Sequence, residues 1–198
     1  MPLAAGMPPV AALATDKVQG FAGTTVAAVT YARRGLVSLR PMKLAAGLTL
    51  AGAFLGALTV RQIDTAVLSL AVSVVLIAVA AYFLFAPRLG DYPRAARLPI
   101  AVFAPPIGFA LGYYDGLLGP GTSSFLSVCF VVLFGLGITR ALAHTKLLNA
   151  ASNLGALVPF VAAGDVVWPA ALSMAAGQLA GGWFGARTGL RCGARLIR

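Results

Sequence analysis

Acidic side chains are scarce in this chain of 198 residues, which contains five aspartates and no glutamate. Charged residues make up only 10% of the sequence, whereas soluble domains carry about 25%. One histidine, His144, and two cysteines, Cys129 and Cys192, complete a short inventory of reactive groups. No nucleotide-binding loop, metal-ligand cluster or nucleophile elbow is present. We therefore expect neither an enzyme nor a bound cofactor or metal.

Apolar residues account for 60% of the chain, and its mean hydropathy is +0.91. A soluble domain of this length could not bury so much apolar surface, because a large share of its residues still contacts solvent. This composition excludes a soluble globular protein, a disordered chain and a coiled coil. It indicates a polytopic membrane protein whose main partner is the lipid bilayer.

Fifteen lysines and arginines give a net charge of +10. On a soluble protein, such an excess would suggest a nucleic-acid partner. Here the basic residues lie between apolar runs, so the preference of cytoplasmic loops for positive charge explains most of them, and we expect no nucleic acid to bind.

The apolar runs predict an all-α bundle of about seven membrane-spanning helices in the cell's inner membrane, since a span needs about 20 apolar residues. We expect Pro105-Pro106 to break the fourth helix. Every second loop is basic, and the others are poor in basic residues, with Asp115 and Asp165 standing alone in two of them. The basic loops are therefore expected in the cytoplasm. The predicted segments are 11–32, 42–60, 63–86, 98–114, 121–138, 139–163 and 168–187.

The sequence matches itself without gaps at an offset of 129 residues. Ala12-Leu13-Ala14 falls on Ala141-Leu142-Ala143, Lys17 on Lys146 and Gly35 on Gly164. The loop at Gly35 is basic and the loop at Gly164 is not, so the two copies are expected to have opposite orientations. Inverted repeats of this kind are typical of transporters, whose substrate site lies between the repeats near the bilayer midplane. Coincidence in a chain rich in alanine and glycine is the alternative.

The predicted domains are 1–97, an incomplete first repeat of about three segments, and 98–198, an incomplete second repeat of about four. Residues 98–129 have no counterpart in the first copy, and the counterpart of 63–86 would begin at residue 192. On this reading the chain is truncated at both ends. A membrane fragment or subunit that needs a partner for the absent helices is therefore the alternative to an active transporter.

The run from Gly112 to Ser124 combines a helix break with polar side chains. The start of a helix offers unpaired backbone N–H groups and partial positive charge, which attract anions. An ordinary capped loop outside the membrane is the alternative. We expect Asp115 to couple transport to protons, since ionisable residues inside a membrane are functional by default. The break is assigned to Gly119, Pro120 and Gly121, and substrate contacts to Thr122, Ser123 and Ser124.

Lys146, Asn149 and Asn153 share one helix face because they are spaced by three and four residues. They could hold an oxyanion, with Lys17 contributing from the other repeat, or a carboxylate such as Asp115 could neutralise Lys146. The structural alternatives are a lysine that reaches the membrane boundary and amides that join helices.

The residues Gly112-Tyr-Tyr-Asp-Gly-Leu-Leu-Gly-Pro-Gly-Thr122 and Thr145-Lys-Leu-Leu-Asn-Ala-Ala-Ser-Asn153 resemble two elements of the sulfite exporter TauE/SafE family, also called toluene-sulfonate uptake permeases. The resemblance covers nearly the whole chain, although Ser123 stands where the family often has glycine. It implies a permease for sulfite, organosulfonates or related carboxylates. The expected function is thus anion transport by alternating access, and the expected small-molecule partner is an anion.

Overall fold

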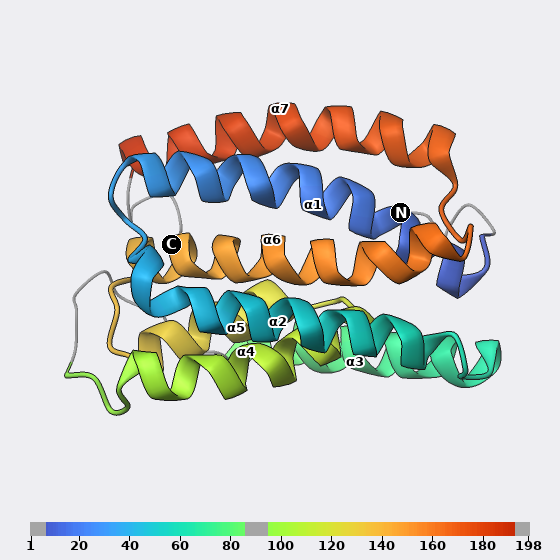
Figure 1. The fold of residues 1–198 in the computed structure, drawn as a ribbon, viewed down its shortest axis with the longest axis horizontal. Coiled ribbons are helices and arrows are strands. Elements are labelled where there is room, and N and C mark those ends of the chain that lie inside the picture. The colour runs from blue at the N-terminus through green and yellow to red at the C-terminus, as the bar shows by residue number, and fades with distance from the viewer. Residues whose placement is uncertain (1–6, 86–94, 193–198) are drawn as a thin grey trace.

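The computed structural model describes residues 7–85 and 95–192, and all regular elements within these ranges are α-helices. The helices lie side by side along the long axis of the molecule (Figure 1). The prediction of an all-α bundle is confirmed. The helices are α1 (Pro9–Arg33), α2 (Leu39–Val60), α3 (Thr65–Phe85), α4 (Ile100–Leu117), α5 (Thr122–Val132), α6 (Ile138–Ala162) and α7 (Trp168–Cys192).

Six of the predicted segments correspond to helices whose ends differ from the predicted ones by a few residues. The prediction for 121–138 was wrong, because α5 ends at Val132 and has 11 residues. At 1.5 Å per residue this helix is about 16 Å long, roughly half the thickness of a bilayer core. The chain leaves the helix there because Gly135 adopts a positive φ of 67°.

Helices α4 and α5 form a hairpin. The backbone N–H groups of Arg97 and Leu98 donate to the carbonyl oxygen of Leu133 at 2.9 and 3.0 Å, so the start of α4 meets the end of α5. The turn between the helices, at residues 118–121, lies beside α1, since a Cβ on Gly119 would be 3.7 Å from the Lys17 ammonium nitrogen. A hairpin that returns to its own side preserves the alternation of basic loops, which explains why charge alone could not reveal it.

The prediction that Pro105-Pro106 breaks a helix was wrong. Both prolines lie inside α4, which continues without interruption from Ile100 to Leu117. Proline removes one backbone donor but keeps a φ close to the helical value, and neighbouring helices compensate for such losses in membrane proteins.

Glycines bring α4 into close contact with α2. A side-chain carbon on Gly112 would collide with the carbonyl oxygen of Thr49, and one on Gly116 would collide with that of Ala53. Small residues at such crossings let two helix backbones approach, which is how helices associate where lipid provides no hydrophobic drive. This packing fixes the end of α4 that carries Asp115.

The helix bounds repeat at the offset seen in the sequence. Shifting both ends of α1 by 129 residues gives the ends of α6, and shifting the start of α2 gives the start of α7. Gly35 and Gly164, which follow α1 and α6, both have positive φ, 69° and 76°. Each pair of equivalent helices runs in opposite directions (Figure 1).

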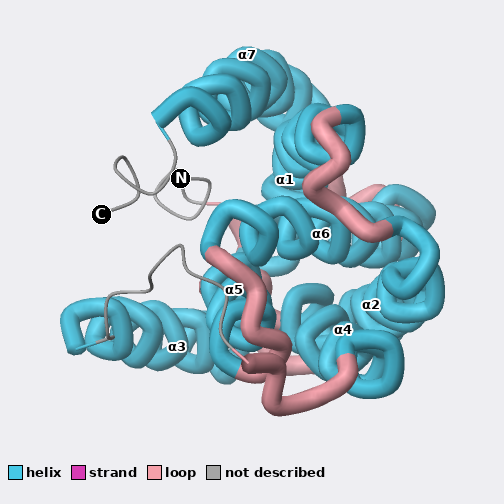
Figure 2. Tube along the Cα trace, turned by 90° about the vertical axis from the view of Figure 1, so that its left-hand side faces the viewer, coloured by secondary structure: helices cyan, strands magenta, loops and turns pink. Residues whose placement is uncertain are grey.

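Helix α6 lies at the centre of the bundle and contacts α1, α2, α4 and α5, while α3 lies at the edge (Figure 2). Large apolar side chains are exposed along the outer helices, including Leu70 and Ile77 of α3 and Phe184 of α7. By length and composition alone, α2 is the one described helix that is long and apolar enough to cross a membrane.

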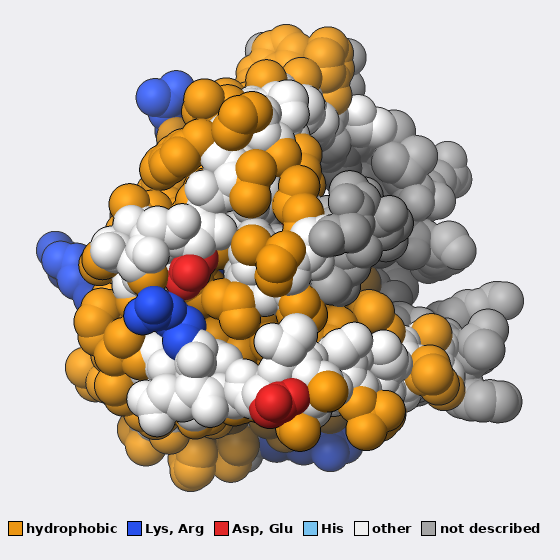
Figure 3. Space-filling model, turned by 90° about the vertical axis from the view of Figure 1, so that its right-hand side faces the viewer, with side chains coloured by type: hydrophobic (Ala, Val, Ile, Leu, Met, Phe, Trp, Pro, Cys, Tyr) orange, Lys and Arg blue, Asp and Glu red, His pale blue; other side chains and the backbone are white. Residues whose placement is uncertain are grey.

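Few charged groups interrupt the apolar surface at the end of the bundle where α2 meets α3 and α6 meets α7 (Figure 3). One of them corrects the expectation that Asp165 stands alone, because its carboxylate lies 3.1 Å from the Nε atom of Arg61. The basic residues described at the opposite end include Arg33, Arg34, Arg40, Arg97 and Arg140. Arg88, Arg94, Arg195 and Arg198 lie outside the described residues.

Candidate functional site

A cavity of about 530 Å³ lies where α1, α6 and α7 meet the turn of the α4–α5 hairpin. Its volume is in the range of small-molecule sites. All side chains that the sequence predicts to contact substrate or protons line it, while Pro120 does not. These predicted residues are Lys17, Asp115, Thr122, Ser123, Ser124, Lys146, Asn149 and Asn153.

Lys17 and Asp115 form a buried ion pair at one end of this cavity. The ammonium nitrogen of Lys17 lies 2.7 Å from Oδ2 of Asp115, and the side chains are 2% and 5% exposed. The hydroxyl of Ser152 donates to the same oxygen at 2.7 Å. Three elements, α1, α4 and α6, therefore converge on one carboxylate.

The position of Asp115 corrects two expectations. It lies inside α4, two residues before the helix ends, and does not stand alone in a loop. Its partner is Lys17, so the alternative in which Asp115 neutralises Lys146 is wrong. The charge pair joins residues 98 positions apart, and only the packing of the hairpin against α1 selects this lysine.

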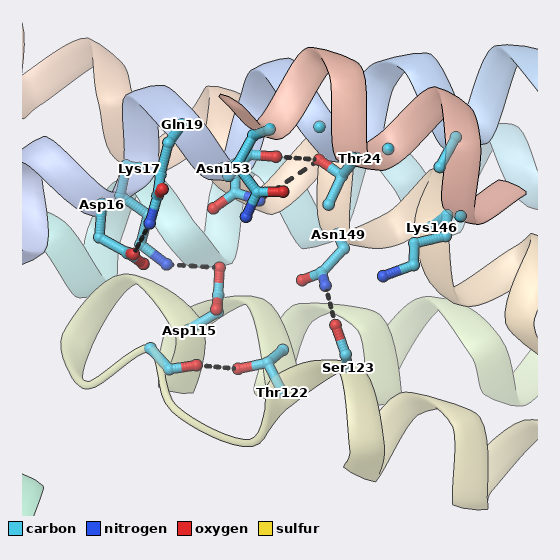
Figure 4. A pocket seen from close by; sticks show the side chains of 18 of the residues that line it. Asp16, Lys17, Gln19, Thr24, Asp115, Thr122, Ser123, Lys146, Asn149 and Asn153 are labelled. Atoms are coloured by element: carbon cyan, nitrogen blue, oxygen red, sulfur yellow. Dashed lines mark hydrogen bonds and ion pairs between the residues drawn. The ribbon is translucent and has the colours of Figure 1, made fainter. Parts of the chain in front are cut away.

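Lys146 lies toward the other end of the cavity (Figure 4). Its ammonium group makes no ion pair or hydrogen bond with any residue in the described ranges. Asn149, one turn further along α6, donates from its side-chain amide to the hydroxyl of Ser123. A cation with no counter-ion, placed beside amide and hydroxyl groups, is suited to bind an anion.

The start of α5 faces the same cavity. Gly119 and Gly121 both have a φ of 86°, a conformation that residues with a Cβ rarely adopt, so the predicted helix break is present. Thr122 and Ser123 begin α5, and their backbone N–H groups have no partner within the helix. These donors add positive electrostatic potential to the cavity.

A seam of hydroxyls holds α5 against α6. The hydroxyls of Ser127 and Thr145 are 3.1 Å apart, and Ser127 also donates to the carbonyl oxygen of Ser123 at 2.7 Å. Together with the bond between Asn149 and Ser123, these contacts join the start of α5 to the helix that carries Lys146. The amide and hydroxyl groups near Lys146 thus belong to one packed unit.

Ser152 is the main site residue that the sequence analysis missed, although it stands three residues after Asn149 on the same face of α6. Asp16 and Gln19 of α1 line the cavity too, and the Gln19 amide donates to Asp16 at 2.5 Å. The α7 residues of the lining gave no signal in the sequence beyond small size and one amide: Gln178, Gly181, Gly182 and Gly185.

His144 is outside the cavity and almost fully buried. Its Nδ1 atom lies 2.8 Å from the carbonyl oxygen of Arg140, and its Nε2 atom accepts a bond from the backbone N–H of Ser38 at 3.3 Å. These contacts give the ring a structural role, because they join α6 to the loop before α2.

Sequence comparisons agree with this architecture. The sequence model of the family described as "Sulfite exporter TauE/SafE" matches residues 1–198. Over 196 residues, the chain is 40% identical to "Probable membrane transporter protein YfcA" of Escherichia coli strain K12, covering 99% of this chain and 73% of that protein. No solved structure matches the chain.

Two further relatives carry similar names. "Probable membrane transporter protein ORF9" of a Sinorhizobium species is 41% identical over 196 residues, 75% of its length. A "Probable membrane transporter protein" of Haemophilus influenzae is 36% identical over 196 residues, 77% of its length. In each case 99% of this chain is aligned, so the cavity-lining residues fall within the matched region.

Proposed function

The chain belongs to the sulfite exporter TauE/SafE family and is related to membrane transporters, and from this premise we propose that it carries a small anion across the inner membrane by alternating access. Sulfite, an organosulfonate or a related carboxylate is the proposed cargo. The bundle crosses the membrane several times in this proposal, with the basic ends of α1, α4 and α6 on the cytoplasmic side.

Lys146 is the observation that carries the proposal. It is the one lysine of the described cavity lining that has no carboxylate partner. Asn149, Asn153, Ser124 and the first N–H groups of α5 surround the cavity with hydrogen-bond donors. Such a site binds an anion through charge-assisted hydrogen bonds, while the helix start supplies further positive potential.

Alternating access is supported by the arrangement of the equivalent helices. In the proposed repeats, 1–97 and 98–198, α1 corresponds to α6 and α2 to α7. The cavity lies between α1 and α6, so rocking of one repeat against the other would expose it to each side in turn.

Asp115 is proposed to couple this movement to protons. The groups around its carboxylate are Lys17 of α1 and Ser152 of α6, with Asp16 and Lys146 also on the cavity wall and Tyr114 next to it on α4. Adding a proton to Asp115 removes the charge that holds Lys17. Lys17 then becomes available as the second cation for the anion, which is how we expect it to contribute.

Binding to the purified protein tests the proposal. Lys146→Met should weaken sulfite and methanesulfonate binding about tenfold or more, since a charge-assisted contact contributes roughly 1.5–3 kcal/mol. Lys43→Met is the matched control, because Lys43 is exposed on α2 and lies outside the cavity. Equal binding by the wild type and Lys146→Met would overturn the assignment of the anion site.

A further inference from the structure

We propose that Asp115 sets the charge of the anion that the cavity accepts, by acting as a built-in counter-ion that reserves Lys17 and leaves one positive charge for the substrate. The inference rests on the proposed function and deepens it. Its consequence is selection of monovalent over divalent anions whenever Asp115 is ionised.

Four charged side chains line the cavity within the described residues: Asp16, Lys17, Asp115 and Lys146. The ion pair neutralises Lys17 and Asp115. Asp16 lies toward the Lys17 end, bonded to Gln19, and Lys146 lies toward the other end (Figure 4). One negative charge on a ligand therefore matches the single uncompensated cation.

A second negative charge has no such match. Its nearest cation would be Lys17, whose ammonium group is already bound to Asp115 at 2.7 Å. Ser152 donates to the same carboxylate oxygen and holds it in place, so the ligand would have to displace a fixed carboxylate. Asp16 adds repulsion at this end of the cavity.

Burial makes this competition effective. Because Lys17 and Asp115 are almost fully shielded from solvent, their attraction is much stronger than between exposed charges. Substituting the carboxylate by an amide of the same shape would leave Lys17 charged and unpaired. The cavity would then present two free cations, which match a dianion.

The experiment compares two tetrahedral anions of similar size, methanesulfonate with one charge and sulfate with two. Both keep their charge between pH 5 and pH 8, roughly, so titration of the ligand does not contribute. The affinity of each is measured by calorimetry on the purified full-length chain in detergent. Wild type should prefer methanesulfonate, and Asp115→Asn should shift the affinity ratio toward sulfate by about tenfold or more.

Asp16→Asn is the matched control, since it removes the same charge from the same cavity but does not release a lysine. We expect it to change the ratio less than about threefold, because its carboxylate is partly exposed and its field is screened. An equal shift in both variants would show that overall cavity charge, and not the pairing of Lys17, sets the preference.

The double variant Lys17→Met/Asp115→Asn keeps the inference testable if Asp115→Asn does not fold. It removes both buried charges and should retain the preference for methanesulfonate. The inference is overturned if Asp115→Asn folds with an unchanged ratio, or if the double variant prefers sulfate. Loss of the Lys146 dependence of methanesulfonate binding would instead overturn the proposed function.

Discussion

Asn153 donates from its side-chain amide to the hydroxyl of Thr24 at 3.5 Å, and the two residues are 129 positions apart. This separation is the offset at which the sequence matches itself and at which the bounds of α1 and α6 coincide. Contact between equivalent positions is what a two-fold axis passing between two antiparallel helices requires. The same region forms the wall of the cavity, so the site lies where the proposed repeats meet.

The buried ion pair should be essential for stability only while one of its charges remains. Lys17→Met leaves Asp115 buried without a counter-ion, and we expect it to lower the free energy of unfolding by about 3–5 kcal/mol. Lys17→Met/Asp115→Asn should recover most of this loss. Thermal unfolding of the detergent-solubilised variants measures both effects, and a double variant as unstable as the single one would refute the expectation.

Asp115→Asn should separate anion movement from the proton gradient. We expect wild-type protein in proteoliposomes to accumulate radiolabelled sulfite in response to a pH gradient, because Asp115 must take up a proton in each cycle. The variant should still exchange sulfite for sulfite but no longer respond to the gradient. A variant with the wild-type rate and unchanged pH dependence would exclude Asp115 from coupling.

The close contact between α4 and α2 should tolerate no side chain at Gly116. Gly116→Ala would place a methyl group against the carbonyl oxygen of Ala53, and the backbone shift should cost about 1–3 kcal/mol of stability. Gly177→Ala is the control, since a Cβ at this position of α7 has no atom within 4 Å. Equal midpoints of thermal unfolding for the two variants would contradict the packing described.

The hairpin predicts a particular pattern of labelling in cells. In a chain with Cys129→Ala and Cys192→Ala, cysteines at Arg34 and Ala96 should react with a membrane-impermeant maleimide only from the cytoplasmic side. A cysteine at Gln62 should react from the opposite side, because all three positions are exposed at ends of the bundle. A cysteine at Pro120, in the hairpin turn, should be protected from the side that labels Gln62. Strong labelling there would show that α4 crosses the whole membrane.

Hydropathy and charge in the sequence were sufficient to predict most of the fold. Seven apolar runs correspond to the helices, and the self-match at 129 residues anticipated the equal bounds of α1 and α6. The effect of the double proline in α4 was misjudged, since local sequence does not show that neighbouring helices can compensate for a lost backbone bond. The short length of α5 was also missed, because the residues after Val132 remain apolar although the helix has ended.

The sequence by itself determined which residues line the site, because a helix break and the spacing of Lys146, Asn149 and Asn153 are local features. Only the tertiary structure decided which of the two lysines is neutralised. Asp115 and Lys17 are far apart in the chain, and the glycine-mediated packing of α4 on α2, together with the turn of the hairpin beside α1, brings them to 2.7 Å. An ion pair depends on distance in space, which no spacing along the sequence specifies.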